Sequence, residues 1–251
     1  MCGRDWSSDV CSSDLDIDVT ARRIVWGKFL NTGQTCLAVD HLWVHRSIKS
    51  QLLQQIARTI AEFYGEAPLQ SADYGRIVNQ YHCDRLQRLV TSGGRIVVGG
   101  QLDPTQRYLS PTVIDDVPLN SPLMQEEIFG PVLPIVPYDD LDNVLRYVNQ
   151  QPNPLAVYFF SKDGDRQQQF TQETRSGAIV INDVVLQVSA PELPFGGVGS
   201  SGMGQYHGKF SFDCFTHHKA VLKRPFWLDV NIRYAPYTSQ KLSLLRRLMR
   251  I

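Results

Sequence analysis

The sequence lacks several features that would assign a protein to a class at once. It has no apolar run near the roughly 18 residues needed to cross a bilayer, and its start lacks the apolar centre of a secretory signal. The 25 basic and 25 acidic side chains give a formal charge of zero, so we expect no nucleic-acid partner. With 43% hydrophobic and 20% charged residues in 251, the chain is expected to be globular, with one sizeable core.

Paired cysteines and metal-ligand spacings are also lacking. The five cysteines are odd in number and scattered, at Cys2, Cys11, Cys36, Cys83 and Cys214. No two of them have the short spacing of a zinc or redox motif, so we expect reduced thiols in the cytoplasm. His217 and His218 are adjacent and would point in different directions, and no carboxylate or cysteine completes a spaced set. The sequence therefore predicts no metal site.

The first fifteen residues differ from the rest of the chain. Residues 1–15, MCGRDWSSDVCSSDL, have little apolar content and no helical or strand period. The run 5–15 is the translation of a DNA string that resembles a common sequencing-adapter oligonucleotide. We interpret residues 1–15 as a disordered leader of foreign origin, an ordinary disordered leader being the alternative. Amplification of the gene from genomic DNA would decide between them.

Helical and strand-like segments alternate through the rest of the chain. Apolar periodicity predicts helices over 16–30, 47–64, 79–92, 139–150 and 163–175, and strands over 37–44, 95–98, 108–117, 155–160 and 178–181. Ser47 is a suitable N-cap, and Gly65 a suitable stop, for the second helix. The continuous apolar run at 155–160 is typical of a strand covered on both faces. The predicted fold is α/β, a mostly parallel sheet covered by helices on both faces.

Three motifs carry the candidate chemistry, and each has a structural alternative. A nucleophilic cysteine must be reachable and populated as thiolate, and Cys36 follows the small residues Gly33 and Thr35. From spacing alone a cysteine is more often a buried core residue, which is our interpretation of Cys83 and Cys214. Residues 125–131, QEEIFGP, can be an acidic helix end stopped by Gly-Pro. Residues 193–202, LPFGGVGSSG, read as a flexible loop, and no Lys-Ser pair follows to make a phosphate loop.

In this order the motifs resemble the C-terminal half of an NAD(P)-dependent aldehyde dehydrogenase. The Gln34-Thr35-Cys36 sequence, and the run 206–213 with the two histidines after it, are most similar to the class 3 branch. The likeness runs from about residue 16 to near the C-terminus. It implies that Cys36 is the nucleophile, because an aldehyde has no leaving group except hydride. Sulfur must add to the carbonyl carbon before hydride can depart to the nicotinamide of NAD or NADP, leaving a thioester.

The resemblance also implies roles for other residues. Glu127 matches the carboxylate that binds the nicotinamide ribose, and Phe129 the aromatic beside it. Phe195 and Val188 would line a substrate tunnel, whose apolar character suits a fatty or aromatic aldehyde. Asn182 is expected to be architectural.

The expected domains are 16–205, the catalytic domain, and 206–251, an oligomerisation strand and C-terminal arm. In this family the strand-like run 215–222 belongs to the region that forms a homodimer. The family's general-base glutamate and oxyanion asparagine would lie before residue 16, so we expect the chain alone to be inactive. A CoA-acylating relative and a non-catalytic oligomerisation domain remain alternatives.

The tail, residues 238–251, alternates leucines with Lys and Arg. We expect it to dock on the absent coenzyme domain. Contact with an anionic membrane surface is the less favoured alternative.

Overall fold

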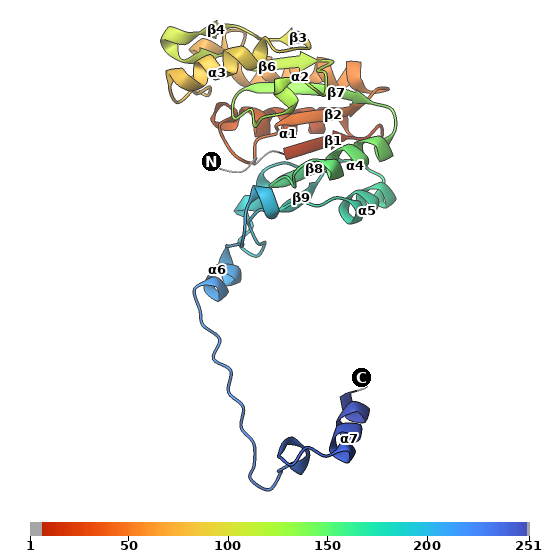
Figure 1. The fold of residues 1–251 in the computed structure, drawn as a ribbon. Coiled ribbons are helices and arrows are strands. Elements are labelled where there is room, and N and C mark those ends of the chain that lie inside the picture. Colours follow the sequence, from red (N-terminus) through yellow and green to blue (C-terminus); the bar gives the residue numbers. More distant parts are fainter. Residues whose placement is uncertain (1–6, 250–251) are drawn as a thin grey trace. The chain divides into compact units, whose positions relative to one another are not determined.

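The computed structural model describes residues 7–249 and divides into a first unit that ends at Phe215 and a second that begins at Thr216. The first unit is built on a seven-stranded sheet in the order β3-β6-β7-β2-β1-β8-β9 (Figure 1). Its strands are β1 (Ser7–Cys11), β2 (His41–His45), β3 (Arg95–Val98), β6 (Thr112–Asp115), β7 (Val132–Tyr138), β8 (Ala156–Phe160) and β9 (Ala178–Ile181). Only β3 runs antiparallel to its neighbour. A separate ribbon pairs β4 (Leu102–Asp103) with β5 (Tyr108–Leu109).

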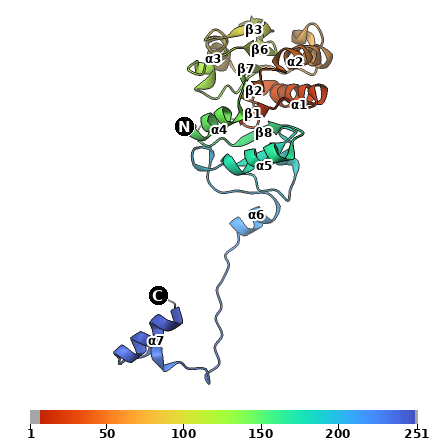
Figure 2. The same cartoon turned by 90° about the vertical axis from the view of Figure 1, so that its right-hand side faces the viewer.

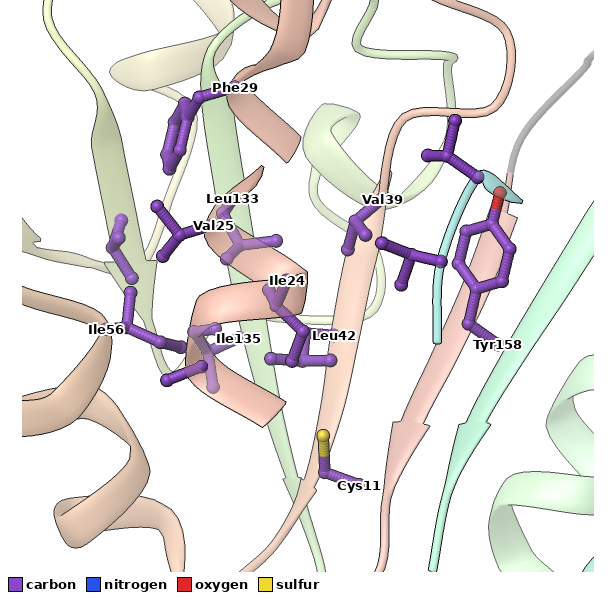
Figure 3. Close-up of a cluster of buried hydrophobic side chains, with 14 of the residues drawn as sticks. Cys11, Ile24, Val25, Phe29, Val39, Leu42, Ile56, Leu133, Ile135 and Tyr158 are labelled. Carbon is purple, nitrogen blue, oxygen red and sulfur yellow. The ribbon is translucent and has the colours of Figure 1, made fainter. Parts of the chain in front are cut away.

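Helices cover both faces of this sheet, as the sequence predicted (Figure 2). The helices are α1 (Ile17–Phe29) and α2 (Lys49–Tyr64) on one face, and α3 (Gln80–Val90), α4 (Leu141–Gln150) and α5 (Gly164–Glu173) on the other. Successive strand residues alternate between the two cores: Leu42 and Val44 pack with α1 and α2, whereas Trp43 packs with the other helices. Figure 3 shows the core on the α1 and α2 side.

Most helix ends follow from capping residues in the sequence. The Asp16 carboxylate accepts a hydrogen bond from the Val19 amide (3.1 Å), and the Asn79 side chain accepts one from the His82 amide (3.0 Å). Gly65 ends α2 with φ +74°. The prediction that Ser47 caps the N-terminus of α2 is wrong. Its hydroxyl is engaged with Nδ1 of His45 (2.8 Å), and helix α2 begins one residue after Ile48.

The expectation of disorder is wrong for residues 7–15. Strand β1 lies between β2 and β8 and pairs in parallel with both. The reason is that the facing edges of β2 and β8 carry backbone N–H and C=O groups that need partners, and any sequence without proline can supply them. After this strand, the carboxylate of Asp14 accepts bonds from the Ser161 hydroxyl and from the amides of Lys162 and Asp163, the latter two at 2.8 Å. Residues 1–6 lie outside the described residues.

Prolines explain two differences at the strands. The strand predicted over 108–117 is divided at Pro111 into β5 and β6, because proline has no amide hydrogen to donate to a neighbour. Strand β7 was not predicted, since Pro134 and Pro137 interrupt its apolar pattern. Both prolines are nevertheless held within an internal strand of the sheet.

The strand predicted over 215–222 is absent, and residues 216–222 have neither helix nor strand. Helix α6 (Gly208–Cys214) closes the first unit, so the division falls later than the predicted boundary at residue 206. A strand needs a hydrogen-bonded neighbour, and the second unit contains no other strand over residues 216–249. Helix α7 (Ser239–Met249) spans most of the tail, and no helix of the described part is long and apolar enough to cross a membrane.

Candidate active site

The predicted nucleophile and the predicted ribose-binding loop meet at one edge of the sheet. Cys36 lies five residues before β2, and Glu127 lies five residues before β7. These strands are parallel neighbours, with Leu42 paired to Ile135. Because parallel neighbours begin at the same edge, the segments that precede them lie side by side.

A tight turn presents the cysteine. Residues Asn31, Thr32 and Gly33 all have positive φ (50°, 58° and 71°), and the turn that contains them follows the end of α1. A Cβ at Gly33 would lie 2.2 Å from the carbonyl oxygen of Gly130. The position therefore requires glycine, both for its backbone conformation and for this close approach. The Cys36 turn is thus packed directly on the end of the EEIFGP segment.

The side chain of Gln34 anchors the same turn to the segment that precedes α3. Its amide nitrogen donates to the carbonyl of Arg76 (3.0 Å), and its oxygen accepts from the amide of Val78 (2.9 Å). Within the turn, the Asn31 side chain donates to the Gln34 carbonyl (3.1 Å). These bonds fix the backbone just before Cys36, so the side chain of Gln34 has a structural role at the site.

The glutamate loop is held from two sides. Oδ1 of Asp40 accepts a hydrogen bond from the amide of Ile128 (3.0 Å). From α3, the guanidinium of Arg85 donates to the carbonyls of Glu127 (3.1 Å) and Ile128. With its backbone fixed, the side chain of Glu127 is half-buried, and Phe129, at φ +45°, is 38% exposed. Glu127 and Phe129 therefore lie at the same edge of the sheet as Cys36.

Buried charges lie beneath this edge. Lys28 is 0% exposed, and burial lowers its pKa to about 8, against the attraction of Asp40, Asp9 and Glu127. Burial likewise raises the pKa of Asp40 to about 6, with Lys28 opposing the change. The neighbouring His41 has its pKa lowered to about 3 by burial and then by the charge of Lys28. Buried ionisable side chains therefore connect α1, the start of β2 and the glutamate loop beneath the site.

Cys36 itself is half-buried and packs against the core on the α1 and α2 side. Its chain neighbour Leu37 accepts a hydrogen bond at its carbonyl from the hydroxyl of Tyr158 (2.8 Å). The other described cysteines differ in setting: Cys11 and Cys83 are buried, and Cys214 is exposed. Of the described cysteines, only Cys36 combines partial exposure with the glutamate loop as a neighbour.

The predicted substrate-lining residues lie on separate segments. Phe195 is half-buried and packs against the same core as Cys36. It exchanges two backbone hydrogen bonds of 2.9 Å with Tyr206, and its ring stacks on His207 (centroids 5.7 Å apart). Val188 is 37% exposed. A groove of about 430 Å³ is lined by residues of α1 and of the segment 183–186, namely Val19, Arg22, Arg23, Trp26, Asp183 and Leu186. Neither Phe195 nor Val188 lines it.

Asn182 has the architectural role expected of it. Its side chain accepts from the amide of Ser161 (2.8 Å) and donates to the carbonyl of the same residue (2.9 Å), with φ +60°. The glycine-rich loop also closes on itself: a Cβ at Gly197 would lie 2.1 Å from the Ser201 carbonyl oxygen. Among residues 7–249, no group of three or more potential metal ligands is present.

Sequence reasoning did not single out Lys28, Asp40, Arg85 or Tyr158. Asp40 and His41 carried a usable signal, since they are polar residues inside an otherwise apolar run at 37–44. Tyr158 carried none, because a tyrosine is common in a buried strand.

The fold and the site define an α/β protein with a candidate thiol nucleophile and a carboxylate loop at the start of neighbouring parallel strands. The chain belongs to the aldehyde dehydrogenase family, whose model matches residues 7–221. Among curated relatives, the family 3 protein comG of Dictyostelium discoideum is 45% identical over 231 residues, which cover 91% of this chain and 49% of the relative. Mouse family 3 member A2 is 46% identical over 232 residues, 92% of this chain and 48% of the relative.

Solved structures agree with this assignment. A substrate-bound Staphylococcus aureus AldH is similar with a TM-score of 0.89 and 43% identity, over 99% of this chain and 54% of that one. A Mycobacterium tuberculosis aldehyde dehydrogenase complexed with NAD⁺ gives 0.78 and 26%, over 90% and 48%. The class 3 resemblance is confirmed. The chain spans about half the length of the curated relatives it matches.

Proposed function

We propose that the protein of which this chain forms part oxidises an aldehyde to a carboxylic acid with NAD or NADP, with Cys36 as nucleophile. The observation that carries the proposal is the packing of the Cys36 turn on the EEIFGP loop, with Gly33 against Gly130. This packing brings the thiol of Cys36 and the segment that contains Glu127 to one edge of the sheet. Membership of the aldehyde dehydrogenase family supports it.

The chemistry assigned to Cys36 is addition followed by acyl release. Its thiolate adds to the carbonyl carbon and forms a thiohemiacetal, which becomes a thioester when hydride departs; water then releases the acid. A nicotinamide cofactor, when bound, supplies the hydride acceptor. The amides of the fixed turn before Leu37 are suited to stabilise the oxyanion of the adduct.

Glu127 and Phe129 are proposed to hold the nicotinamide end of the cofactor. The residues fit such a group: Glu127 is a half-buried carboxylate on a backbone fixed by Asp40 and Arg85, and Phe129 is exposed beside it. A carboxylate can accept both ribose hydroxyl protons, which positions the ring relative to Cys36. Both cofactors occur in the family: a mouse relative is named NADP-preferring, and the Mycobacterium structure contains NAD⁺.

The proposed substrate is an apolar aldehyde. Phe195 packs on the same core as Cys36, and Val188 is exposed on the turn that also carries Leu186. Apolar walls of this kind favour fatty or aromatic chains by removing their surface from water.

The proposed partner of the longer protein is a second copy of itself, with a cytoplasmic location. The mouse relative is named dimeric. The run 215–222 contains exposed apolar residues, Val221 and Leu222, and the second unit, over residues 216–249, contains no strand. A neighbouring copy would supply the hydrogen-bonding edge that a strand there requires.

Labelling with an apolar thiol-reactive aldehyde analogue tests the proposal. We expect selective modification at Cys36, located by peptide mass spectrometry and abolished in Cys36→Ser. The exposed Cys214 is the internal control. An unmodified Cys36 beside a labelled Cys214 would refute the nucleophile and favour a non-catalytic domain of the same fold.

A further inference from the structure

Two further polar side chains, Tyr158 and Gln187, lie close to the backbone that follows the proposed nucleophile. Tyr158 in β8 is 0% exposed, and its hydroxyl donates to the carbonyl of Leu37, the residue after Cys36 (2.8 Å). The side-chain nitrogen of Gln187 approaches the same hydroxyl at 3.3 Å. In Figure 3 the hydroxyl of Tyr158 points away from Cys11 and toward the level of Val39. This is the end of β2 from which the chain leads back to Cys36.

The direction of these hydrogen bonds is fixed by chemistry. The amide nitrogen of Gln187 can only donate and the carbonyl of Leu37 can only accept, so the hydroxyl of Tyr158 must accept from one and donate to the other. Burial raises the pKa of Tyr158, and the charges of Asp9 and Cys36 raise it further, against the hydrogen bonds from Gln187 and the Val185 backbone. The hydroxyl therefore keeps its proton at any pH at which the thiol reacts. A chain of two aligned bonds is more strongly polarised than two separate ones.

Gln187 belongs to a segment that is tied to α1. Arg23 donates to the carbonyl of Asn182 and pairs with Asp183 (3.7 Å). A Cβ at Gly27 would lie 2.3 Å from a methyl group of Val184, so the helix and the segment are in close contact. Val185 follows at φ +64°, a conformation that a β-branched residue adopts only under constraint. The amide of Gln187 is thus held in place from the α1 side.

We infer that Tyr158 and Gln187 are positioning residues for Cys36: their hydrogen-bond chain fixes the Leu37 carbonyl, and with it the backbone that aims the thiol. The inference rests on the nucleophilic role proposed for Cys36. It differs from that role because it assigns the aim of the sulfur to two side chains from other parts of the chain, the buried Tyr158 and the half-buried Gln187. It also links the nucleophile to the segment 182–189, which borders the groove through Asp183 and Leu186.

The test is the rate of Cys36 alkylation by iodoacetamide in the full 251-residue chain, followed by peptide mass spectrometry from pH 6 to 10. Tyr158→Phe keeps the buried ring and removes the donor to Leu37, so we expect the plateau rate constant to fall about five- to tenfold. Gln187→Met removes the first donor from a half-buried position without threatening the core, and we expect a fall of about threefold. Because one chain contains both bonds, the double variant should match Tyr158→Phe alone.

Tyr138→Phe is the matched control. Tyr138 is also a buried strand tyrosine, and its hydroxyl donates to the carbonyl of Cys11 (3.0 Å), away from the nucleophile. It should lower the free energy of unfolding to a similar extent and leave Cys36 alkylation unchanged. Equal slowing by Tyr138→Phe would show general loosening and overturn the inference.

The outcomes separate the inference from the proposed function. If wild-type Cys36 reacts more slowly than Cys214, the nucleophile itself is refuted. If wild-type Cys36 reacts rapidly, and both Tyr158→Phe and Gln187→Met match its rate, then the positioning role alone is wrong.

Discussion

At the scale of single residues, the site depends on two conditions that only glycine meets at position 33. One is the positive φ of 71°, and the other is the absence of space beside the Gly130 carbonyl. Gly65 shares the first condition, at φ +74°, but has open space around it. Alanine substitutions at Gly33 and Gly65 therefore separate the cost of the backbone conformation from the cost of the steric clash.

We predict that Gly33→Ala lowers the free energy of unfolding by about 3 kcal/mol or more, because a methyl group must displace the EEIFGP loop. Gly65→Ala, the control, should cost only about 1 kcal/mol from its backbone conformation. Urea unfolding of both variants measures the difference. Equal effects would mean that the close contact between the two site segments is absent.

His41 gives the stability of the protein a dependence on acid. Its pKa is lowered from 6.5 to about 3 in the folded chain. The contribution of neutral His41 to the free energy of unfolding is fully present above pH 6.5 and is lost as the pH falls toward 3. Over that range only the unfolded state binds the proton.

We predict that His41→Phe reduces the slope of the free energy of unfolding against pH by up to about 1.4 kcal/mol per pH unit between pH 6 and 4. Chemical unfolding at several pH values measures the slope for each protein, and the other titrating groups are common to both. Parallel slopes in the two proteins would contradict a buried neutral His41.

At the scale of elements, the pair Lys28 and Asp40 connects α1, the start of β2 and the loop before β7. Asp40 has two tasks there: it accepts from the Ile128 amide, and its charge faces the buried Lys28. Asp40→Asn keeps an acceptor for the amide and removes the charge, whereas Lys28→Met removes the ammonium group. The two tasks can therefore be separated.

We predict that Asp40→Asn lowers the free energy of unfolding by about 3 kcal/mol, because a buried cation loses its main counter-charge. Adding Lys28→Met should recover part of this loss, since it removes the unpaired buried cation, whereas the buried Asp9, the second counter-charge of Lys28, remains. Thermal or urea unfolding of the single and double variants measures this. A double variant as unstable as Asp40→Asn would show that the charges do not interact.

Elements were predictable where their pattern was local. Asp16, Asn79 and Gly65 mark helix ends by side-chain chemistry, and the strand at Ala156–Phe160 follows from an unbroken apolar run. Strand β1 was missed because its SSDVC sequence has no strand pattern, and its place depends on the exposed edges of β2 and β8. The strand expected over 215–222 does not form, and the second unit, over residues 216–249, contains no other strand that could pair with it.

The site was predictable only through its motifs. Cys36, Glu127, Phe129 and Phe195 were named from sequence resemblance, and the structure shows how the first two reach one edge. The residues that support them come from distant positions: Arg85 lies 42 positions before Glu127, and Tyr158 lies 121 positions after Leu37. No local pattern encodes such pairs, because they are created by the packing of strands and helices.

At the scale of the whole molecule, the chain spans about half the length of its relatives. We predict that the purified chain does not turn over aldehydes, because we expect the general-base glutamate and oxyanion asparagine implied by the resemblance before residue 16. Absorbance at the NADH band, with either cofactor and an apolar aldehyde, measures this. Sustained NADH or NADPH production that Cys36→Ser abolishes would contradict it and would show a complete site.

The nucleophilic role of Cys36 is tested by its alkylation rate relative to Cys214 in one sample of the wild-type chain near neutral pH. The two thiols share reagent, time and protein, and Cys214 is the more exposed. We predict that Cys36 is modified faster despite its lower exposure, because its turn presents the thiol as a nucleophile. Modification of Cys214 with Cys36 left intact would contradict it.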